Sequence, residues 1–292
     1  MPISPFRPQN VLILPNAAVP KAKHLAEVVE AFLSKNRVKT QKFPYNYDEQ
    51  NNIPNLEGID LVIVLGGDGS LLRAGHLCAP KGIPLLGVQS GKLGFLVELN
   101  EADLESGLNR LLEGDFRLEN RLMLTASLYS REQLKMSWDV INEAVVCRGK
   151  EVRPIEVRVD LSEGYLNSYI ADGVIVATPT GSTAYALAAG GPILPPELRN
   201  MLILPIAPHL SLDRAVVLAE GAQVNLYPTI KHDVVLSIDG MDPVPLLEGD
   251  RIHISANQQS LHMIRFGEQN YFYRDLAAVM QRNPILETGK ND

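Results

Sequence analysis

The sequence predicts an α/β domain with a doubly wound, mostly parallel sheet, followed by an all-β domain built as a sandwich or a barrel. Up to about residue 116, short apolar β-branched runs alternate with amphipathic helical stripes, a pattern typical of parallel sheets. Farther along, apolar and polar residues alternate in short runs, as in antiparallel sheets. At 292 residues the chain is long enough for two domains. We expect them to abut, with the functional site in a cleft between them.

Helices and strands alternate through the first domain. Apolar runs predict strands at residues 11–14, 38–43, 61–65 and 83–88. A first helix is expected to end near Asn36, because one helical stripe collects Leu25, Val28, Val29, Phe32 and Leu33. A second helix is expected to begin at Ser70 and to stop near Pro80. A third is expected to follow Asn100 as its N-cap and to end at Gly114, with a stripe formed by Leu104, Leu108, Leu111 and Leu112.

The second domain is predicted from short alternating runs at residues 155–159, 165–170, 173–177, 223–227, 233–238 and 261–266. We expect these runs to be antiparallel strands, with helix confined to residues 182–189 and to a terminal helix at residues 275–281. The predicted limits are residues 1–118 for the first domain and 119–268 for the second. We expect residues 269–292 to pack back on the first domain.

Charge and cysteine content argue against a nucleic-acid-binding or membrane-associated protein and favour a cytoplasmic one. The chain has 27 Lys and Arg against 34 Asp and Glu, and the resulting charge of −7 argues against a general nucleic-acid or anionic-membrane surface. Cys78 and Cys147 lie far apart in apolar surroundings without metal-ligand spacing, so we expect buried free thiols and a cytoplasmic protein. We expect neither a signal peptide nor a membrane-spanning segment.

The most informative motif is Gly66-Gly67-Asp68-Gly69, which follows the apolar run at residues 61–65 and precedes a predicted helix. A strand that leads into a glycine turn and a helix N-terminus directs free N–H groups and a partial positive charge at one spot, which suits phosphate oxygens. A carboxylate there would repel phosphate unless it holds a metal ion or accepts a proton from an attacking hydroxyl. The motif therefore indicates phosphoryl transfer, with a plain tight turn as the alternative for an isolated match.

A second set of polar residues comprises Asn142-Glu143, Asp172-Gly173 and residues 178–185. An amide offers donors and an acceptor, and a carboxylate offers acceptors, so the pair suits a ligand with hydroxyl groups. The N–H groups of residues 180–182 suit phosphate oxygens if a helix starts there. Taken alone, the Asn-Glu pair also fits a solvated strand end, and the threonine-rich stretch also fits an N-cap before a helix of small residues.

Taken in order along the chain, these motifs resemble those of the NAD kinase family, whose members phosphorylate the 2′-hydroxyl of the adenosine ribose of NAD to make NADP. The resemblance extends through residues 91–96 and 178–192, and through Pro208-His209 and Asp239-Gly240. It implies an N-terminal α/β domain and a C-terminal β-sandwich. It also implies NAD and ATP as substrates, Mg²⁺ or another divalent cation that arrives with ATP, and a homo-oligomer, either a dimer or a tetramer.

The resemblance also implies roles for individual residues. Asp68 would accept the proton, and the phosphates would meet Gly66, Gly67, Thr180, Gly181 and Ser182. NAD would contact Gly69, Arg73, Phe95, Asn142, Glu143, Arg153, Asp172, Thr183, Ala184, Tyr185 and Ala188. Two departures affect ligand contacts, because Ala188 stands where many relatives have Ser and Met241 where Gln is frequent. His209 matches the family's Pro-His element, but a lone His in a β domain is more often structural, so we leave it out of the catalytic set.

Two alternative functions stay open at this point. Another kinase with a Gly-Gly-Asp-Gly motif, acting on a sugar or a lipid, is not expected to carry Asn142-Glu143 together with residues 178–185. A non-catalytic NAD(P)-binding sensor on the same scaffold would have no need of Asp68. A Walker loop does not compete, because residues 87–93 have the wrong length and lack the final hydroxyl.

Overall fold

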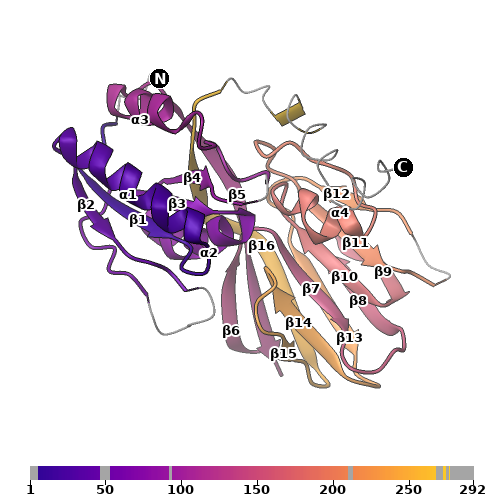
Figure 1. The fold of residues 1–292 in the computed structure, drawn as a ribbon. Coiled ribbons are helices and arrows are strands. Elements are labelled where there is room, and N and C mark those ends of the chain that lie inside the picture. The colour runs from indigo at the N-terminus through magenta and orange to yellow at the C-terminus, as the bar shows by residue number, and fades with distance from the viewer. Residues whose placement is uncertain are drawn as a thin grey trace, which may run out of the picture. The chain divides into compact units, whose positions relative to one another are not determined.

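The computed structural model describes residues 6–46, 53–91, 94–209, 213–267, 272–273 and 276. It divides the chain into two compact units, whose elements are labelled in Figure 1. Unit 1 is Met1–Asn120 together with the chain from Leu261, and unit 2 is Arg121–Ser260. The predicted limits at residues 118 and 268 stay predictions, as does the packing of residues 269–292.

The sheet of unit 1 is parallel. Its strands are β1 (Asn10–Pro15), β2 (Lys39–Lys42), β3 (Leu61–Gly66) and β4 (Leu85–Gln89), in the order β2-β1-β3-β4. The four predicted strands are thereby confirmed. The end of β16 (Asp250–Arg265) also pairs with β4 in parallel, with Met263 opposite Leu85. Our expectation of antiparallel pairing for residues 261–266 does not hold for their contact with β4, because the alternation within a strand does not encode the direction of its partner.

Helices cover both faces of this sheet. They are α1 (Pro20–Lys35), α2 (Asp68–Cys78) and α3 (Leu104–Glu113), and a 3₁₀ turn (Ala79–Lys81) follows α2. Leu25 of α1 and Leu108 of α3 share one core cluster with Ile63 of β3. On the opposite face, the side chain of Leu71 in α2 fills the space beside Gly87 in β4. This arrangement confirms the doubly wound fold, in which both faces of the parallel strands are buried.

Three details of the helices differ from expectation. Helix α2 begins at Asp68, two residues before Ser70, so the carboxylate belongs to its first turn. Val28 is 43% exposed and lies off the buried stripe of α1. Oδ1 of Asn100 accepts the N–H of Asp103 at 3.1 Å, as an N-cap side chain does, but residues 101–103 form a turn and the N-cap of α3 is Asp103. Gly114 ends α3 in the left-handed region, with φ of 77°, as predicted.

Unit 2 consists of two packed sheets. One contains β5 (Arg117–Ser130), β6 (Gln133–Val140), β8 (Ile155–Leu161), β9 (Gly164–Ala171), β13 (Val224–Thr229) and the first part of β16. The other contains β7 (Glu143–Arg148), β10 (Gly173–Ala177), β11 (Met201–Ile206), β12 (Val216–Leu218), β14 (Val234–Ile238) and β15 (Val244–Pro245). Neighbouring strands run antiparallel, as β8 does with β9 and β10 does with β7.

Apolar side chains from both sheets of unit 2 form one core. Val157 and Leu226 of the first sheet belong to the same cluster as Val146 and Val174 of the second. The architecture is therefore a β-sandwich, as expected. The outer face of the second sheet is covered where Ala186 packs in a separate cluster. Ala186 lies in the short helix α4 (Tyr185–Ala188), which follows a 3₁₀ turn (Gly181–Thr183) and confirms the helix predicted at residues 182–189.

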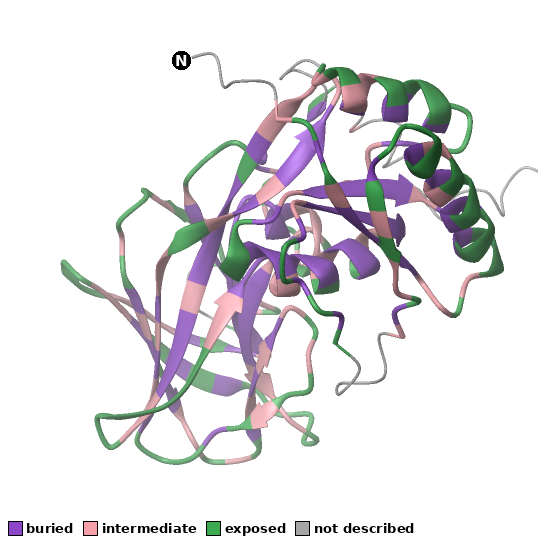
Figure 2. Cartoon of the chain, turned by 90° about the vertical axis from the view of Figure 1, so that its left-hand side faces the viewer, coloured by how far each residue is buried: buried purple, intermediate pink, exposed green. Residues whose placement is uncertain are grey.

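Burial follows this layered plan. Figure 2 shows buried residues along the strands and exposed ones at the turns and on the outer sides of the helices. Cys78 is buried and Cys147 half-buried, and both are free thiols. No helix in the described part of the chain is long and apolar enough to cross a membrane. The predicted terminal helix at residues 275–281 lies, apart from residue 276, outside the described residues.

Candidate active site

Asp68 stands where β3 gives way to helix α2, and two backbone donors hold its carboxylate. The N–H of Phe95 donates to Oδ2 at 2.8 Å, and the N–H of Leu96 donates to Oδ1 at 3.0 Å. Gly94 makes this approach possible, because the carboxylate occupies the space that a Cβ at position 94 would need. A half-buried carboxylate therefore lies at the N-terminus of helix α2, and the N–H groups of the loop at residues 94–96 fix the orientation of its oxygens.

The glycines around Asp68 fall into two kinds. Gly66 is required by packing, because the side chain of Ser70 fills the space beside it, and Asn16 donates to that hydroxyl at 3.3 Å. At Gly67 and Gly69, a Cβ would meet no atom of the described residues within 4 Å, and neither glycine has a positive φ. Packing within the described chain therefore gives no reason for glycine at these two positions. Open space beside a bare backbone suits the close approach of a ligand.

The other predicted residues of unit 1 lie around this turn. Arg73 is exposed on α2, and its charge lowers the pKa of Tyr45, which burial raises by a larger amount. Phe95 is half-buried, and its ring centroid lies 6.3 Å from that of Phe272. The backbone N–H of Phe95 thus contacts Asp68, while its aromatic ring lies near the ring of Phe272.

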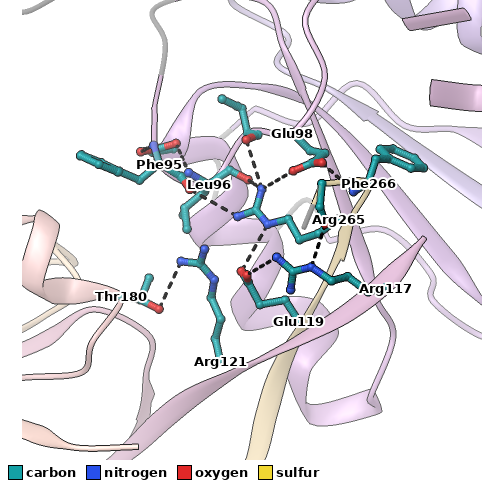
Figure 3. A network of polar contacts seen from close by, with 12 residues as sticks. Phe95, Leu96, Glu98, Arg117, Glu119, Arg121, Thr180, Arg265 and Phe266 are labelled. Atoms are coloured by element: carbon teal, nitrogen blue, oxygen red, sulfur yellow. Dashed lines mark hydrogen bonds and ion pairs between the residues drawn. The ribbon is translucent and has the colours of Figure 1, made fainter. Parts of the chain in front are cut away.

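Sequence reasoning missed Arg265, which holds the same loop from its other side (Figure 3). This side chain is 1% exposed, and its guanidinium donates to the carbonyl oxygens of Phe95, Leu96 and Val97 at 3.2–3.3 Å. It also forms ion pairs with Glu98 at 2.9 Å and with Glu119 at 3.2 Å. The one signal in the sequence is a cation near the end of the alternating run at residues 261–266.

Asn142 and Glu143 lie at the start of β7 in unit 2, where Asp239 organises their backbone. The carboxylate of Asp239 accepts the N–H groups of Ile141, Asn142 and Glu143 at 2.7–2.8 Å. Asp239 itself has φ of 49°, and Gly240 follows it in the left-handed region. Asp239, in a tight turn with Gly240, therefore fixes the backbone of Asn142 and Glu143. The sequence did not predict this role, because 97 positions separate Asn142 from Asp239.

The carboxylate of Glu143 is buried, and only 7% of the residue is exposed. Burial, followed by the charge of Asp239, raises its pKa to about 8, and the backbone N–H of Tyr185 opposes this effect. Its Oε2 atom has no hydrogen-bond partner within the described part of the chain. A buried oxygen of this kind is available to a ligand hydroxyl.

The threonine-rich loop is held mainly by its own hydrogen bonds. The hydroxyl of Thr178 donates to the carbonyl oxygen of Ile141 at 2.6 Å and accepts the N–H of Gly181 at 3.0 Å. The N–H of Ser182 donates to the carbonyl oxygen of Thr178, and its hydroxyl is fully buried against Pro179 and Leu194. Gly181 and Ser182 therefore do not present free N–H groups to a phosphate, contrary to the route we expected. Thr180 is buried too, and its hydroxyl accepts from Arg121 at 3.4 Å.

Tyr185 lies close to Glu143 and to Asp172. The Asp172 carboxylate forms an ion pair with Arg148 at 3.1 Å. Burial, then the charges of Cys147, Asp172 and Glu143, raise the pKa of the Tyr185 hydroxyl, which Arg148 lowers. The structure thus brings these predicted residues together, beside the half-buried Cys147.

The remaining predicted residues of unit 2 differ in exposure. Ala188 is exposed, and Thr183 and Ala184 are half-buried. Arg153 is different, because its side chain is 66% exposed and faces Glu151 at 3.9 Å. Met241 belongs to the Asp239 turn, where its N–H donates to the carbonyl oxygen of Ile238 at 2.8 Å. The exposed His209 contributes a backbone N–H to Ile170.

Among the described residues, no group of three His, Cys, Asp or Glu side chains could hold a metal ion. Asp68, the carboxylate nearest the predicted phosphate turn, has one backbone donor on each oxygen, which leaves each oxygen one further acceptor position. A divalent cation at this site would therefore depend on phosphate oxygens and water for most of its ligands.

Two family models match this chain. The ATP-NAD kinase N-terminal domain matches residues 11–116, and the ATP-NAD kinase C-terminal domain matches residues 141–266. The NAD kinase of Heliobacterium modesticaldum is 41% identical over 228 residues, which cover 78% of this chain and 80% of that protein. The NAD kinase of Chloroflexus aurantiacus is 36% identical over 271 residues, covering 92% of this chain and 96% of the relative.

Two solved structures share the fold. Yeast NADH kinase complexed with NADH superimposes with a TM-score of 0.84 and 24% identity, covering 97% of this chain and 92% of that chain. An NAD kinase from Archaeoglobus fulgidus in complex with ATP gives a TM-score of 0.74 and 23% identity, covering 93% of this chain and 98% of that chain.

Proposed function

Because the chain belongs to the NAD kinase family, we propose that it transfers the γ-phosphoryl group of ATP to the 2′-hydroxyl of the adenosine ribose of NAD, with Asp68 as the proton acceptor. The observation that carries the role of Asp68 is its setting. Two N–H groups fix the carboxylate beside the open backbone of Gly67 and Gly69. An ionised carboxylate has about four acceptor positions, so two stay available for a hydroxyl proton.

The order of events follows from the basicity of the carboxylate. A carboxylate is a weak base toward an alcohol, so proton transfer comes late, as attack on the γ-phosphorus proceeds. A positioned base contributes about 10²–10⁴-fold to the rate, and positioning with charge neutralisation supplies most of the remainder. Gly66 and Gly67 receive the phosphates in this proposal. Mg²⁺ enters as part of the MgATP substrate.

The proposal assigns the NAD contacts to the predicted residues. Glu143 offers its unpartnered oxygen and Asn142 its amide to ribose hydroxyls, while Asp172 and Tyr185 contact the nicotinamide end. Gly69 gives the dinucleotide close access to the backbone of the turn. The other proposed contacts are Arg73, Phe95, Arg153, Thr183, Ala184 and Ala188. Thr180, Gly181 and Ser182 stay proposed as residues near the phosphates. The proposal includes a homo-oligomer in the cytoplasm.

The test compares Asp68→Asn with Asp103→Asn, which makes the same change just before helix α3 of unit 1. We expect Asp68→Asn to lower kcat for NADP formation from NAD and MgATP by about 10²–10⁴-fold, because the amide accepts no proton from the hydroxyl. NAD binding, measured by calorimetry, should weaken only modestly. Asp103→Asn should keep its turnover.

Other results would argue against the proposal. Near-normal turnover of Asp68→Asn would remove Asp68 from its role. Stabilisation of the wild-type protein by NAD in a thermal-shift assay, with no ATP-dependent NADP, would identify a sensor. A panel of sugar and lipid acceptors completes the test, because phosphorylation of one of these in preference to NAD would identify a different kinase.

A further inference from the structure

The loop at residues 94–98 is bonded on two opposite sides. The N–H groups of Phe95 and Leu96 donate to Asp68, and the carbonyl oxygens of Phe95, Leu96 and Val97 accept from Arg265. These contacts join α2 to the end of β16, although 197 positions separate the two side chains (265 − 68). Figure 3 shows the guanidinium in the middle of the carbonyl groups and carboxylates that it contacts.

The peptide group between Phe95 and Leu96 takes part in both sets of contacts. In a trans peptide the C=O and N–H bonds point in opposite directions. The carbonyl of this peptide accepts from Nη2 of Arg265 at 3.3 Å, and its N–H donates to Oδ1 of Asp68 at 3.0 Å. A cation thus faces the negative end of the peptide dipole and an anion faces its positive end, so each contact strengthens the other. Rotation of this peptide would break both hydrogen bonds.

Arg265 is itself fixed by buried acids. Its Nε donates to Glu119 at 3.2 Å, and its Nη1 donates to Glu98 at 2.9 Å. The second oxygen of Glu98 accepts the N–H of Phe266 at 2.7 Å. The side chains of Arg265 and Glu119 are 1% and 0% exposed, so solvent screens this pair little. The guanidinium spans the three carbonyls and two carboxylates through its planar fork of five donors, which an ammonium group cannot reproduce.

We propose that Arg265 is a positioning residue for phosphoryl transfer, which holds the loop at residues 94–98 so that its N–H groups orient the carboxylate of Asp68. This inference rests on the proposed function of Asp68. Arg265 does not touch the reacting atoms in this scheme. It acts on turnover through the geometry of the base, so its loss should lower kcat while substrate binding persists.

The chain offers a matched control in Arg117. This arginine also contacts Glu119, with Nη2 to Oε2 at 3.3 Å, and its Nε donates to the carbonyl oxygen of Gly267 at 3.1 Å. Neither of these contacts involves residues 94–98. Arg265→Lys and Arg117→Lys therefore both disturb a cationic partner of the same buried acid, but the hydrogen bonds that hold the loop come from Arg265.

The experiment measures kcat, KM, thermal stability and backbone hydrogen exchange for both lysine variants of the full chain. We expect Arg265→Lys to lower kcat by about tenfold to hundredfold, because small displacements of a reacting group are costly. KM for MgATP should change by no more than about threefold, and KM for NAD should change less than kcat, since Phe95 is the one proposed NAD contact within residues 94–98. Amides in peptides that cover residues 94–99 should exchange faster in Arg265→Lys than in the wild type. Arg117→Lys should leave kcat and this exchange near the wild-type values, even where its Tm falls.

Each remaining result decides the inference. A kcat for Arg265→Lys no lower than that of Arg117→Lys would overturn it, and so would a lowered kcat with unchanged exchange of the loop. If Arg265→Lys does not fold, the double variant Arg265→Gln with Glu119→Gln removes the cation together with a counterion, and the same loss of kcat and of exchange protection is expected. If the wild type forms no NADP, the proposed function is refuted. Unchanged hydrogen exchange of residues 94–98 in Arg265→Lys would separately refute the claim that Arg265 holds this loop.

Discussion

Asp68 of unit 1 and Asp239 of unit 2 use their carboxylates in the same local way, yet their surroundings assign them different tasks. Each accepts N–H groups from a loop distant in sequence, residues 95–96 for Asp68 and residues 141–143 for Asp239. Asp68 receives two such donors at the open end of a helix, beside glycines with empty space around them. Asp239 receives three within a tight turn.

The difference shows how a protein separates a reactive carboxylate from a structural one. Two donors fix the orientation of a carboxylate and leave acceptor positions for a substrate hydroxyl. Three donors from consecutive residues instead tie the carboxylate to the backbone that it supports. Asp68 is therefore expected to affect turnover, and Asp239 to affect the stability of unit 2 and the placement of Asn142 and Glu143.

The largest effect that separates the two aspartates is expected for Asp239→Ala. Three backbone donors lose a charged acceptor, so the free energy of unfolding of unit 2 should fall by about 3 kcal/mol or more. Urea unfolding monitored by the fluorescence of Trp138, the one tryptophan of the sequence and part of β6 in unit 2, measures this change. KM for NAD should rise as well.

Asp233→Ala is the matched control for that substitution, because it changes an exposed aspartate at the start of the same strand region. It should leave unfolding unchanged within about 0.5 kcal/mol. A loss of kcat in Asp239→Ala at saturating NAD, with wild-type stability, would break the distinction between a reactive and a structural carboxylate.

Gly94→Ala tests the same distinction from the side of Asp68. A methyl group at position 94 would occupy the place of the Asp68 carboxylate, which must then turn away from residues 95–96. We expect kcat to fall by about a hundredfold, as for other displaced catalytic groups. Steady-state assays with NAD and MgATP measure it. Gly91→Ala is the control in the same segment, because a Cβ there meets nothing within 4 Å among the described residues. Equal kcat values for the two variants would refute the packing argument.

Glu143→Gln should change the pH dependence of stability. The folded state raises the pKa of Glu143 from 4.5 to about 8, so between these values the folded protein binds more protons at this site than the unfolded chain. The stabilisation is fully present below pH 4.5 and is lost as pH rises toward 8. The free energy of unfolding of Glu143→Gln should therefore fall less between pH 5 and pH 8.5 than that of the wild type. We expect a difference on the order of 2 kcal/mol, which allows for water that reaches the buried acid.

Unfolding experiments at pH 5 and at pH 8.5, again followed by Trp138, measure this difference. Glu163→Gln, which alters an exposed glutamate in the turn between β8 and β9, is the control and should keep the wild-type slope. If the free energy of unfolding of Glu143→Gln changes with pH as in the wild type, the carboxylate of Glu143 is solvated. Neither burial nor Asp239 would then raise its pKa.

Local patterns predicted much of the fold. The strand at residues 61–65, the helix that ends near Asn36 and the left-handed Gly114 were predicted correctly, because periodicity and backbone preference act over a few residues. The errors have a common cause. The partner of residues 261–266 depends on chain direction, and the first residue of α3 depends on which backbone hydrogen bonds form after Asn100. Periodicity contains neither.

The sequence by itself determined the two-part architecture and the positions of the motifs, because glycine turns and apolar periods are written in neighbouring residues. Only the tertiary structure decided what holds the motifs in place. The partners of Asp68, Asn142 and Arg265 lie 27, 97 and up to 170 positions away. Such contacts depend on the path of the strands between the partners. Tertiary structure also decided which N–H groups are free, because the N–H of Ser182, expected to meet a phosphate, is hydrogen-bonded within the chain.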